Sequence, residues 1–206
     1  GLPPALLEGF ESRSRAFVQV QQGCDQSCTF CVIHRARGQS RSFDEAHILR
    51  QVRNFVSGGF SEVVICGVDL GSYESPGFED GSQLPLASLL KKIADIPGAF
   101  RIRLSSVDPV HLTDDLVAVL SDSERFCPYL HVSIQSGSTL ILKRMKRRYD
   151  REFLIDRLES ARQHINGLVL GADVMAGFPT ESEQDFADTV DVIDRAQVIY
   201  PHVFSF

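Results

Sequence analysis

Apolar and polar positions alternate in blocks that predict a regular succession of strands and helices. Short apolar runs typical of strands occupy residues 16–21, 62–67, 101–105, 129–134, 168–174 and 202–206. Helical periodicity occupies residues 44–57, 84–94, 113–121, 139–145, 151–164 and 181–196. Because the strand runs are short and mostly apolar, we expect strands that are buried on both faces. A loop is expected at residues 72–83, which are rich in Gly, Ser and acidic residues.

This succession predicts an α/β fold built from consecutive right-handed βα units. Six strands with intervening helices favour a partial (β/α)6 barrel, an open relative of the eight-stranded TIM barrel. Asp44 and Thr113 stand where two of the helices should begin, and both residue types favour helix N-caps. Active sites of such folds lie at the carboxyl ends of the strands, so motifs that follow strands carry the functional interpretation.

Three cysteines follow the first predicted strand. Cys24, Cys28 and Cys31 lie within the segment CDQSCTFC, close enough to bind three irons of a cubic [4Fe–4S] cluster. Complete ligation of such a cluster takes four cysteines. A cluster held by three leaves one iron free to bind another ligand, which indicates a catalytic site rather than a structural one.

Two other interpretations of the cysteines are weaker. A structural zinc site needs four Cys or His ligands, usually in two pairs, and only His34 lies near enough to complete the set. A disulfide framework fits poorly because the chain has five cysteines, an odd number. Cys66 and Cys127 stand alone in apolar segments, where a free cysteine usually behaves as a small buried hydrophobic residue.

Composition fits a globular intracellular enzyme. The chain has 206 residues, of which 43% are hydrophobic and 23% charged, which are ordinary values for a folded domain. We expect a cytoplasmic protein without a membrane segment, since the sequence shows neither an apolar run of spanning length nor a signal-peptide pattern. The net charge of −6 does not favour nucleic-acid binding by the chain as a whole, but basic residues cluster locally at residues 34–41 and 143–148.

The cysteine motif, with Phe30 before its third cysteine, resembles the signature of the radical S-adenosylmethionine (SAM) enzymes. In that family the open iron binds the amino and carboxylate groups of SAM, and the core fold is the same six-stranded partial barrel. Residues at the ends of the other predicted strands are then expected to contact SAM through backbone, hydroxyl, amide or carboxylate groups. They are Gly67, Val68 and Asp69 after the second strand, Ser105 after the third, Ser133 and Gln135 at the end of the fourth, and Asp173 and Gly177 around the fifth.

A narrower resemblance covers nearly the whole chain. The segments GVDLGSY, RIRLSS, HVSIQSGS, LKRMKRRY and GFPTESEQDF together resemble the radical SAM methylthiotransferases that modify tRNA. The GVDLG element is most similar to the branch that acts on N6-threonylcarbamoyladenosine beside the anticodon. This resemblance implies addition of a methylthio group to C2 of that adenosine, after reductive cleavage of SAM to a 5′-deoxyadenosyl radical.

The resemblance also implies partners and further domains. Family members use a reducing electron donor such as flavodoxin or ferredoxin. They carry a second, auxiliary [4Fe–4S] cluster in an N-terminal domain and a tRNA-binding module at the C-terminus. Residues 1–206 are therefore expected to be the radical SAM core, a fragment of a longer enzyme. The alternatives are another substrate, namely isopentenyladenosine in tRNA or an aspartate of a ribosomal protein, and a noncatalytic RNA-binding module stabilised by a metal.

The basic residues divide into three groups. Arg35 and Arg37 directly follow the cysteine loop, so we expect them to contact substrate phosphates. The family pattern implies that Arg147 pairs with the SAM carboxylate, for which the planar guanidinium is suited. The remaining basic residues at 143–146 are expected to form a solvated helix face. We predict no functional role for the five histidines outside the cysteine loop, because each stands alone in the sequence: His47, His111, His131, His164 and His202.

Overall fold

A computed structural model describes residues 14–75 and 84–206 of the chain. Its main strands are β1 (Arg15–Gln19), β4 (Glu62–Cys66), β7 (Arg101–Leu104), β8 (Tyr129–Gln135), β9 (Val169–Ala176) and β10 (Val198–Ser205). Hydrogen bonds join them into two parallel sheets, in the orders β1-β4-β7 and β10-β9-β8. Isolated parallel bridges from Ile102 of β7 to Phe126 and from Val107 to Val132 of β8 link the two sheets. The six strands thus form one open arc, which confirms the predicted partial barrel.

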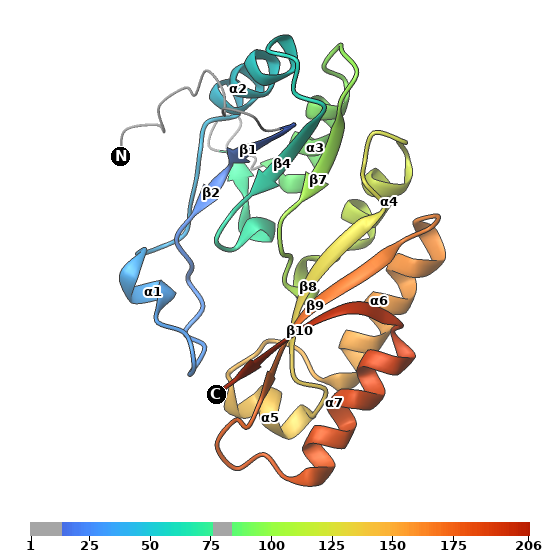
Figure 1. Ribbon diagram of the computed structural model, residues 1–206. Helices are drawn as coiled ribbons and strands as arrows, with labels where there is room; N and C mark the ends of the chain where they lie inside the picture. The colour runs from blue at the N-terminus through green and yellow to red at the C-terminus, as the bar shows by residue number, and fades with distance from the viewer. Residues whose placement is uncertain (1–13, 76–83) are drawn as a thin grey trace.

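The helices cover the outer face of this arc (Figure 1). They are α2 (Glu45–Ser57), α3 (Leu86–Ala94), α4 (Asp114–Ser121), α5 (Thr139–Arg144), α6 (Arg151–His164) and α7 (Glu183–Arg195). Asp44 accepts a hydrogen bond from the backbone N–H of His47, and Thr113 one from that of Leu116. Both predicted N-caps are confirmed.

The expectation that the strands are buried on both faces is wrong. In β8, Leu130, Val132 and Ile134 are buried while the residues between them are only half-buried, and β1 and β7 alternate in the same way. The buried residues pack against the helices in one continuous core. The other face lines the concave side of the arc, so it carries polar residues. Among the main strands, β4 and β9 each have a run of three consecutive buried residues.

Several short elements were not predicted. β2 (Gln21–Gln22) pairs antiparallel with β3 (Arg41–Ser42), and α1 (Ile33–Ala36) lies between them. β5 (Glu74–Ser75) pairs with β6 (Leu84–Pro85), and two 3₁₀ turns occupy Leu70–Ser72 and Pro109–His111. Most of the loop expected at 72–83 lies outside the described residues. The last strand begins at Val198, earlier than predicted. Val198 is buried and the other residues of this strand are exposed, so its sequence carries no alternation of buried and exposed positions.

Candidate functional site

The cysteine loop leaves the carboxyl end of β1 and is tied at its base. The β2–β3 pair holds the two ends together, and the N–H of Cys24 donates to the carbonyl of Gly38 at 3.1 Å. The fully buried Gln21 strengthens this closure, since its Nε2 donates to the carbonyl of Gly23 at 2.8 Å and to Ser40 Oγ at 2.9 Å. Sequence-distant segments therefore fix where the loop begins and ends.

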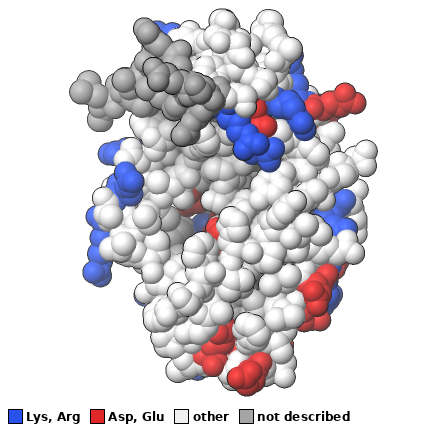
Figure 2. Space-filling model, in the orientation of Figure 1, with Lys and Arg blue, Asp and Glu red and all other residues white. Residues whose placement is uncertain are grey.

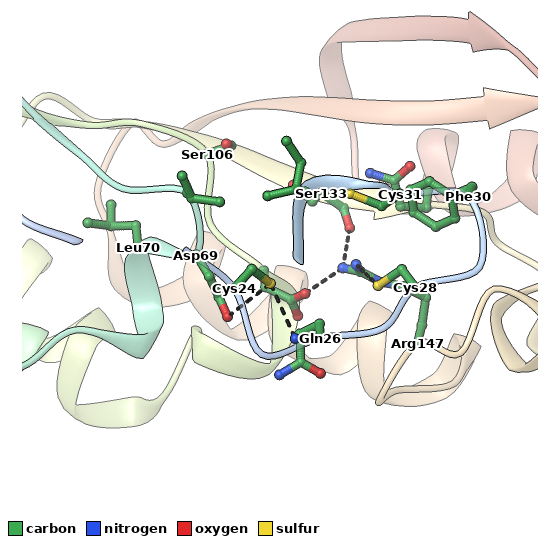
Figure 3. A pocket seen from close by; sticks show the side chains of 14 residues that line it. Cys24, Gln26, Cys28, Phe30, Cys31, Asp69, Leu70, Ser106, Ser133 and Arg147 are labelled. Atoms are coloured by element: carbon green, nitrogen blue, oxygen red, sulfur yellow. Dashed lines mark hydrogen bonds and ion pairs between the residues drawn. The ribbon is translucent and has the colours of Figure 1, made fainter. Parts of the chain in front are cut away.

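Cys24, Cys28 and Cys31 all line one pocket. Figure 3 shows the three side chains around this space. None of the three is in a disulfide bond. Within the part of the chain that the structure describes, they do not form a set whose sulfurs all lie within 4.8 Å of one another. Thiolates on one tetrahedral zinc would be about 3.8 Å apart, so the three thiols are not placed to bind a single zinc ion together.

The surroundings of Cys24 give its thiolate little stabilisation. Burial raises the pKa of this thiol, the N–H of Gln26 offsets part of that effect, and the charges of Asp69 and the other two cysteines raise the pKa further. Metals bind the thiolate form. A positively charged metal centre would stabilise the three cysteine thiolates, so the residues fit an iron–sulfur cluster.

Asp69 places a negative charge at the rim of the pocket. Its side chain is 8% exposed; Oδ2 accepts a hydrogen bond from Ser72 Oγ at 2.7 Å, and Oδ1 lies 3.3 Å from Nε2 of His111. Burial alone would raise the pKa of Asp69, but the bonds with His111 and Ser72 outweigh it and lower the pKa. The carboxylate is therefore ionised at neutral pH, and it can receive an ammonium group.

Arg147 crosses the pocket beside the cysteines. Its Nη2 donates to Asp108 Oδ2 at 2.5 Å and to the carbonyl of Ser133 at 3.1 Å, while Nη1 lies 3.6 Å from Cys28 Sγ. Burial would lower the pKa of Arg147, but Tyr149, Asp108 and Cys28 together raise it. Nη2 is thus paired with Asp108, and Nη1 points toward Cys28, a predicted cluster ligand.

The end of β8 has an irregular backbone where it meets the pocket. The register against β9 shifts between Val132 and Gln135, and Gln135 has a φ of 67°, which is uncommon for a residue other than glycine. The Tyr149 hydroxyl donates to the carbonyls of Ser133 and Ile134, both at 2.8 Å, and holds this conformation. Such maintained strain is typical of functional sites, and here it directs Gln135 into the pocket.

The structure brings most of the predicted residues together. Besides the three cysteines, Phe30, Val68, Asp69, Ser133, Gln135 and Arg147 line the pocket. Gly67, Ser105, Asp173 and Gly177 do not. A side chain at Gly67 would lie 2.8 Å from Leu70 Cα and 3.0 Å from Gln21 Oε1. That glycine is needed for local packing, which explains its presence without a ligand.

Three of the other predicted contacts take different positions. The Ser105 hydroxyl is buried and has no hydrogen-bond partner among the described residues. Asp173 is bonded to His131 at 3.0 Å, and Gly177, with a φ of 79°, donates its N–H to Glu181. Asp173 and Gly177 are thus bonded to other residues of the protein.

Arg35 and Arg37 lie on the outer side of the cysteine loop. Both are exposed, and Arg35 lines a second depression together with Cys28, Cys31, His34 and Lys146. Figure 2 shows that Lys and Arg side chains gather along the edge that carries α1, whereas acidic side chains gather over the end that carries α7. The cysteine loop therefore faces a positively charged surface on one side and the pocket on the other.

Sequence reasoning missed several contributors. Asp108, Gln26 and Ser106 line the pocket, and Asp108 could have been found as an acid shortly after the third strand. Three of the histidines for which we predict no functional role have polar partners that the sequence did not reveal. His111 is bonded to Asp69 and Ser72, and His131 and His202 share Asp173. These contacts join different strands and loops, so no local pattern reveals them.

Comparisons with known proteins agree with this geometry. Residues 18–193 match the radical SAM superfamily. The threonylcarbamoyladenosine tRNA methylthiotransferase MtaB of Rickettsia prowazekii (strain Madrid E) is 43% identical over 98% of this chain and 47% of its own length. The MtaB of Bacillus subtilis (strain 168) is 38% identical over 97% of this chain and 44% of its own length. The tRNA-2-methylthio-N(6)-dimethylallyladenosine synthase of Rickettsia akari (strain Hartford) is 38% identical over 93% of this chain and 42% of its own length. The chain thus spans about half the length of these relatives.

Solved structures share the fold. The radical SAM methyltransferase TsrM from Kitasatospora setae, solved with cobalamin and a [4Fe–4S] cluster, matches with a TM-score of 0.73 and 14% identity, over 92% of this chain and 36% of TsrM. Coproporphyrinogen III oxidase (HemN) from Escherichia coli matches with a TM-score of 0.61 and 17% identity, over 92% of this chain and 43% of HemN. Three convergent thiols, an open six-stranded arc and a match that covers most of the sequence lead to one conclusion: this chain belongs to the radical SAM superfamily.

Proposed function

We propose that this chain is the radical SAM core of a tRNA methylthiotransferase that modifies C2 of N6-threonylcarbamoyladenosine. The observation that carries the proposal is the set of three free thiols around one pocket, in a sequence 38–43% identical to three MtaB enzymes over almost its full length. The dimethylallyladenosine synthases match at up to 38%, so that nucleoside is the second candidate substrate.

The residues divide the work within the pocket. Cys24, Cys28 and Cys31 would hold a [4Fe–4S] cluster, which, when bound with SAM, supplies the electron and the hydrogen-abstracting radical of this superfamily. The ionised Asp69 and the amide of Gln135 are placed to orient a ligand that carries an ammonium group and hydroxyls. Arg147 stabilises the negative charge near Cys28. Phe30, Val68 and Leu70 contribute apolar surface that excludes water.

Substrate contacts are expected on the opposite side of the cysteine loop. Arg35 and Arg37 are free to meet RNA phosphates, and the positively charged edge in Figure 2 continues beside them. No described helix is long and apolar enough to cross a membrane. In the proposed reaction a cytoplasmic reductant such as flavodoxin or ferredoxin supplies the electron, and the auxiliary cluster that donates sulfur lies in a domain preceding residues 1–206.

Competition between two tRNA substrates tests the proposal. The full-length enzyme, with both clusters reconstituted, would be given equal amounts of tRNA carrying threonylcarbamoyladenosine and tRNA carrying isopentenyladenosine. Mass spectrometry of the digested nucleosides should show the methylthio product of the first and little of the second. Preferential modification of isopentenyladenosine would overturn the substrate assignment, and modification of neither would overturn the proposed activity.

A further inference from the structure

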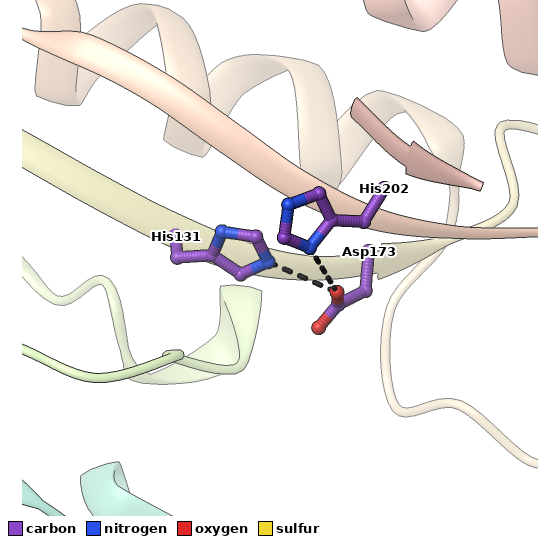
Figure 4. A group of neighbouring side chains, drawn as sticks. All are labelled: His131, Asp173 and His202. Atoms are coloured by element: carbon purple, nitrogen blue, oxygen red, sulfur yellow. Dashed lines mark hydrogen bonds and ion pairs between the residues drawn. The ribbon is translucent and has the colours of Figure 1, made fainter. Parts of the chain in front are cut away.

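Three polar side chains meet on the concave face of the sheet, outside the pocket. His131 comes from β8, Asp173 from β9 and His202 from β10, and all three converge at one point (Figure 4). Nε2 of His131 lies 3.0 Å from Asp173 Oδ1, and Nδ1 of His202 lies 3.7 Å from the same oxygen. We propose that these residues form a binding site for a divalent transition-metal ion of the zinc class.

The distances match those that such an ion requires. Zinc lies about 2.0–2.2 Å from His nitrogen and carboxylate oxygen, which puts two ligands of a tetrahedral ion about 3.4 Å apart. The two measured separations, 3.0 and 3.7 Å, lie on either side of this value. All three ligand atoms lie within 4.8 Å of one another.

The donor set selects the kind of ion. Two imidazoles and one carboxylate suit zinc and iron(II), whereas magnesium and calcium prefer oxygen ligands alone. Three protein ligands leave at least one coordination position open, as in catalytic zinc sites. That position faces the concave side of the arc, because the three residues lie on that face.

A supporting contact orients His131. The Tyr129 hydroxyl lies 3.0 Å from Nδ1 of His131, so Nε2 is the nitrogen turned toward Asp173. A side chain at Gly171 would lie 2.3 Å from the Tyr129 hydroxyl and 2.9 Å from Nδ1 of His131. The glycine therefore leaves the space that this contact needs. Partners of this kind fix the ring orientation of metal-binding histidines.

Charge and access are compatible with a cation. The nearby Arg103, whose guanidinium lies 5.3 Å from the centre of the Tyr129 ring, is bonded to Glu62 at 2.8 Å, which offsets its charge. The side chains of His131 and Asp173 are 14% and 25% exposed, whereas His202 is 64% exposed. Two ligands are thus preorganised, and the third lies at the opening through which an ion enters.

The site is separate from the cysteines but lies near the pocket. Ser133, which lines the pocket, follows His131 by two residues on the same face of β8, roughly 7 Å along the strand. An ion bound here would therefore face the same concave space as a molecule in the pocket. Its binding requires neither the cluster nor SAM.

Zinc binding can be measured with the cysteine loop disabled. Cys24, Cys28 and Cys31 would be replaced together by Ser, so that added zinc cannot bind there, and Zn²⁺ would be titrated in competition with a chromophoric chelator. We expect one equivalent per chain, with affinity falling at least 100-fold in His131→Ala and Asp173→Ala. Tyr129→Phe should weaken binding about 10- to 100-fold. His164→Ala, which alters an exposed histidine on α6, should change nothing.

A second measurement uses the intact cysteines. After cluster reconstitution and addition of Zn²⁺, elemental analysis should find one zinc per chain in addition to the iron. His131→Ala should lose the zinc and keep the iron. This measurement decides the matter if the triple Ser variant does not fold. Absence of zinc from the reconstituted chain, or zinc retained equally by His131→Ala and Asp173→Ala, would overturn the proposal.

Discussion

At the scale of single residues, the five cysteines separate into two kinds by their surroundings. Cys24, Cys28 and Cys31 line the pocket, whereas Cys66 and Cys127 do not. Burial raises the pKa of Cys66 to about 11, and burial also raises the pKa of Cys127. Burial raises the pKa of Cys24 as well, so the pKa of the thiol does not distinguish the two kinds of cysteine. Chemical type alone therefore does not make a ligand; position does.

This separation predicts the iron content of cysteine variants. After anaerobic reconstitution, Cys24→Ala, Cys28→Ala and Cys31→Ala should each lose the cluster absorbance and most of the iron, because two thiolates cannot hold the cluster. Cys66→Ala and Cys127→Ala are the matched controls and should retain about four irons per chain. Iron and sulfide analysis decides the assignment, which would be wrong if either control variant lost its iron.

Arg147 allows a second prediction at this scale. Because its guanidinium contacts Asp108, the Ser133 carbonyl and Cys28, Arg147→Ala should leave a buried carboxylate unpaired and distort the pocket. A charge-assisted contact contributes about 1.5–3 kcal/mol, so SAM binding should weaken roughly 10- to 150-fold. Lys143→Ala, at an exposed position on α5, serves as the control. Calorimetric titration of the reconstituted chain would measure both, and equal affinities would remove Arg147 from the site.

At the scale of elements, the sequence predicted the succession of strands and helices but not the polar contacts between them. Periodicity and N-caps are local, so Asp44 and Thr113 were identified from a few neighbouring residues. The polar concave face was missed because strands buried on one face, as in this open arc, and strands buried on both faces can show the same short apolar runs in the sequence. Partners such as Arg147 and Asp108, 39 residues apart in the chain, come together only through the order of the strands.

The link between α5 and α7 shows how such a contact stabilises the fold. Asp185 accepts hydrogen bonds from Ser138 at 2.5 Å and from the N–H and hydroxyl of Ser182 at 2.9 and 2.6 Å. One carboxylate therefore completes the capping box of α7 and holds the N-cap residue of α5. The pKa of Asp185 is lowered, first by the hydrogen bond from Ser138 and then by those from Ser182.

This lowered pKa predicts how stability depends on pH. A carboxylate with a lower pKa in the folded state stabilises that state above its unfolded pKa of about 3.9. The contribution is lost as the pH falls through the folded pKa. Asp185→Ala should therefore reduce the free energy of unfolding by about 1–2 kcal/mol at pH 7, and the difference from wild type should shrink below about pH 4. Asp188→Ala, which removes a carboxylate that accepts a hydrogen bond from the Gln184 side chain, is the control. Urea unfolding at several pH values would measure both, and a pH-independent difference would contradict this account.

At the scale of the whole molecule, the two sides of the cysteine loop differ in the residues that they carry. The pocket side holds Asp69, Gln135 and Arg147, which surround the predicted cofactor. The outer side carries exposed Arg35 and Arg37 and belongs to the positively charged edge of the molecule (Figure 2). A loop that separates the two surfaces would let the cofactor react while the RNA backbone is held outside.

Such a separation predicts that SAM cleavage and RNA binding respond to different substitutions. The reconstituted chain with dithionite should cleave SAM slowly to 5′-deoxyadenosine without any tRNA, and Cys28→Ala should abolish this activity. In the full-length enzyme, the double variant Arg35→Ala, Arg37→Ala should retain cleavage but bind tRNA more weakly. Because each lost phosphate contact reduces the dependence of log K on log salt by about 0.7–0.9, the salt slope should fall by about 1.5. Lys92→Ala, on α3 and away from the loop, should change neither quantity. If the arginine variant lost SAM cleavage and kept its affinity for tRNA, these residues would belong to the cofactor side, and the proposed division between the two surfaces would be wrong.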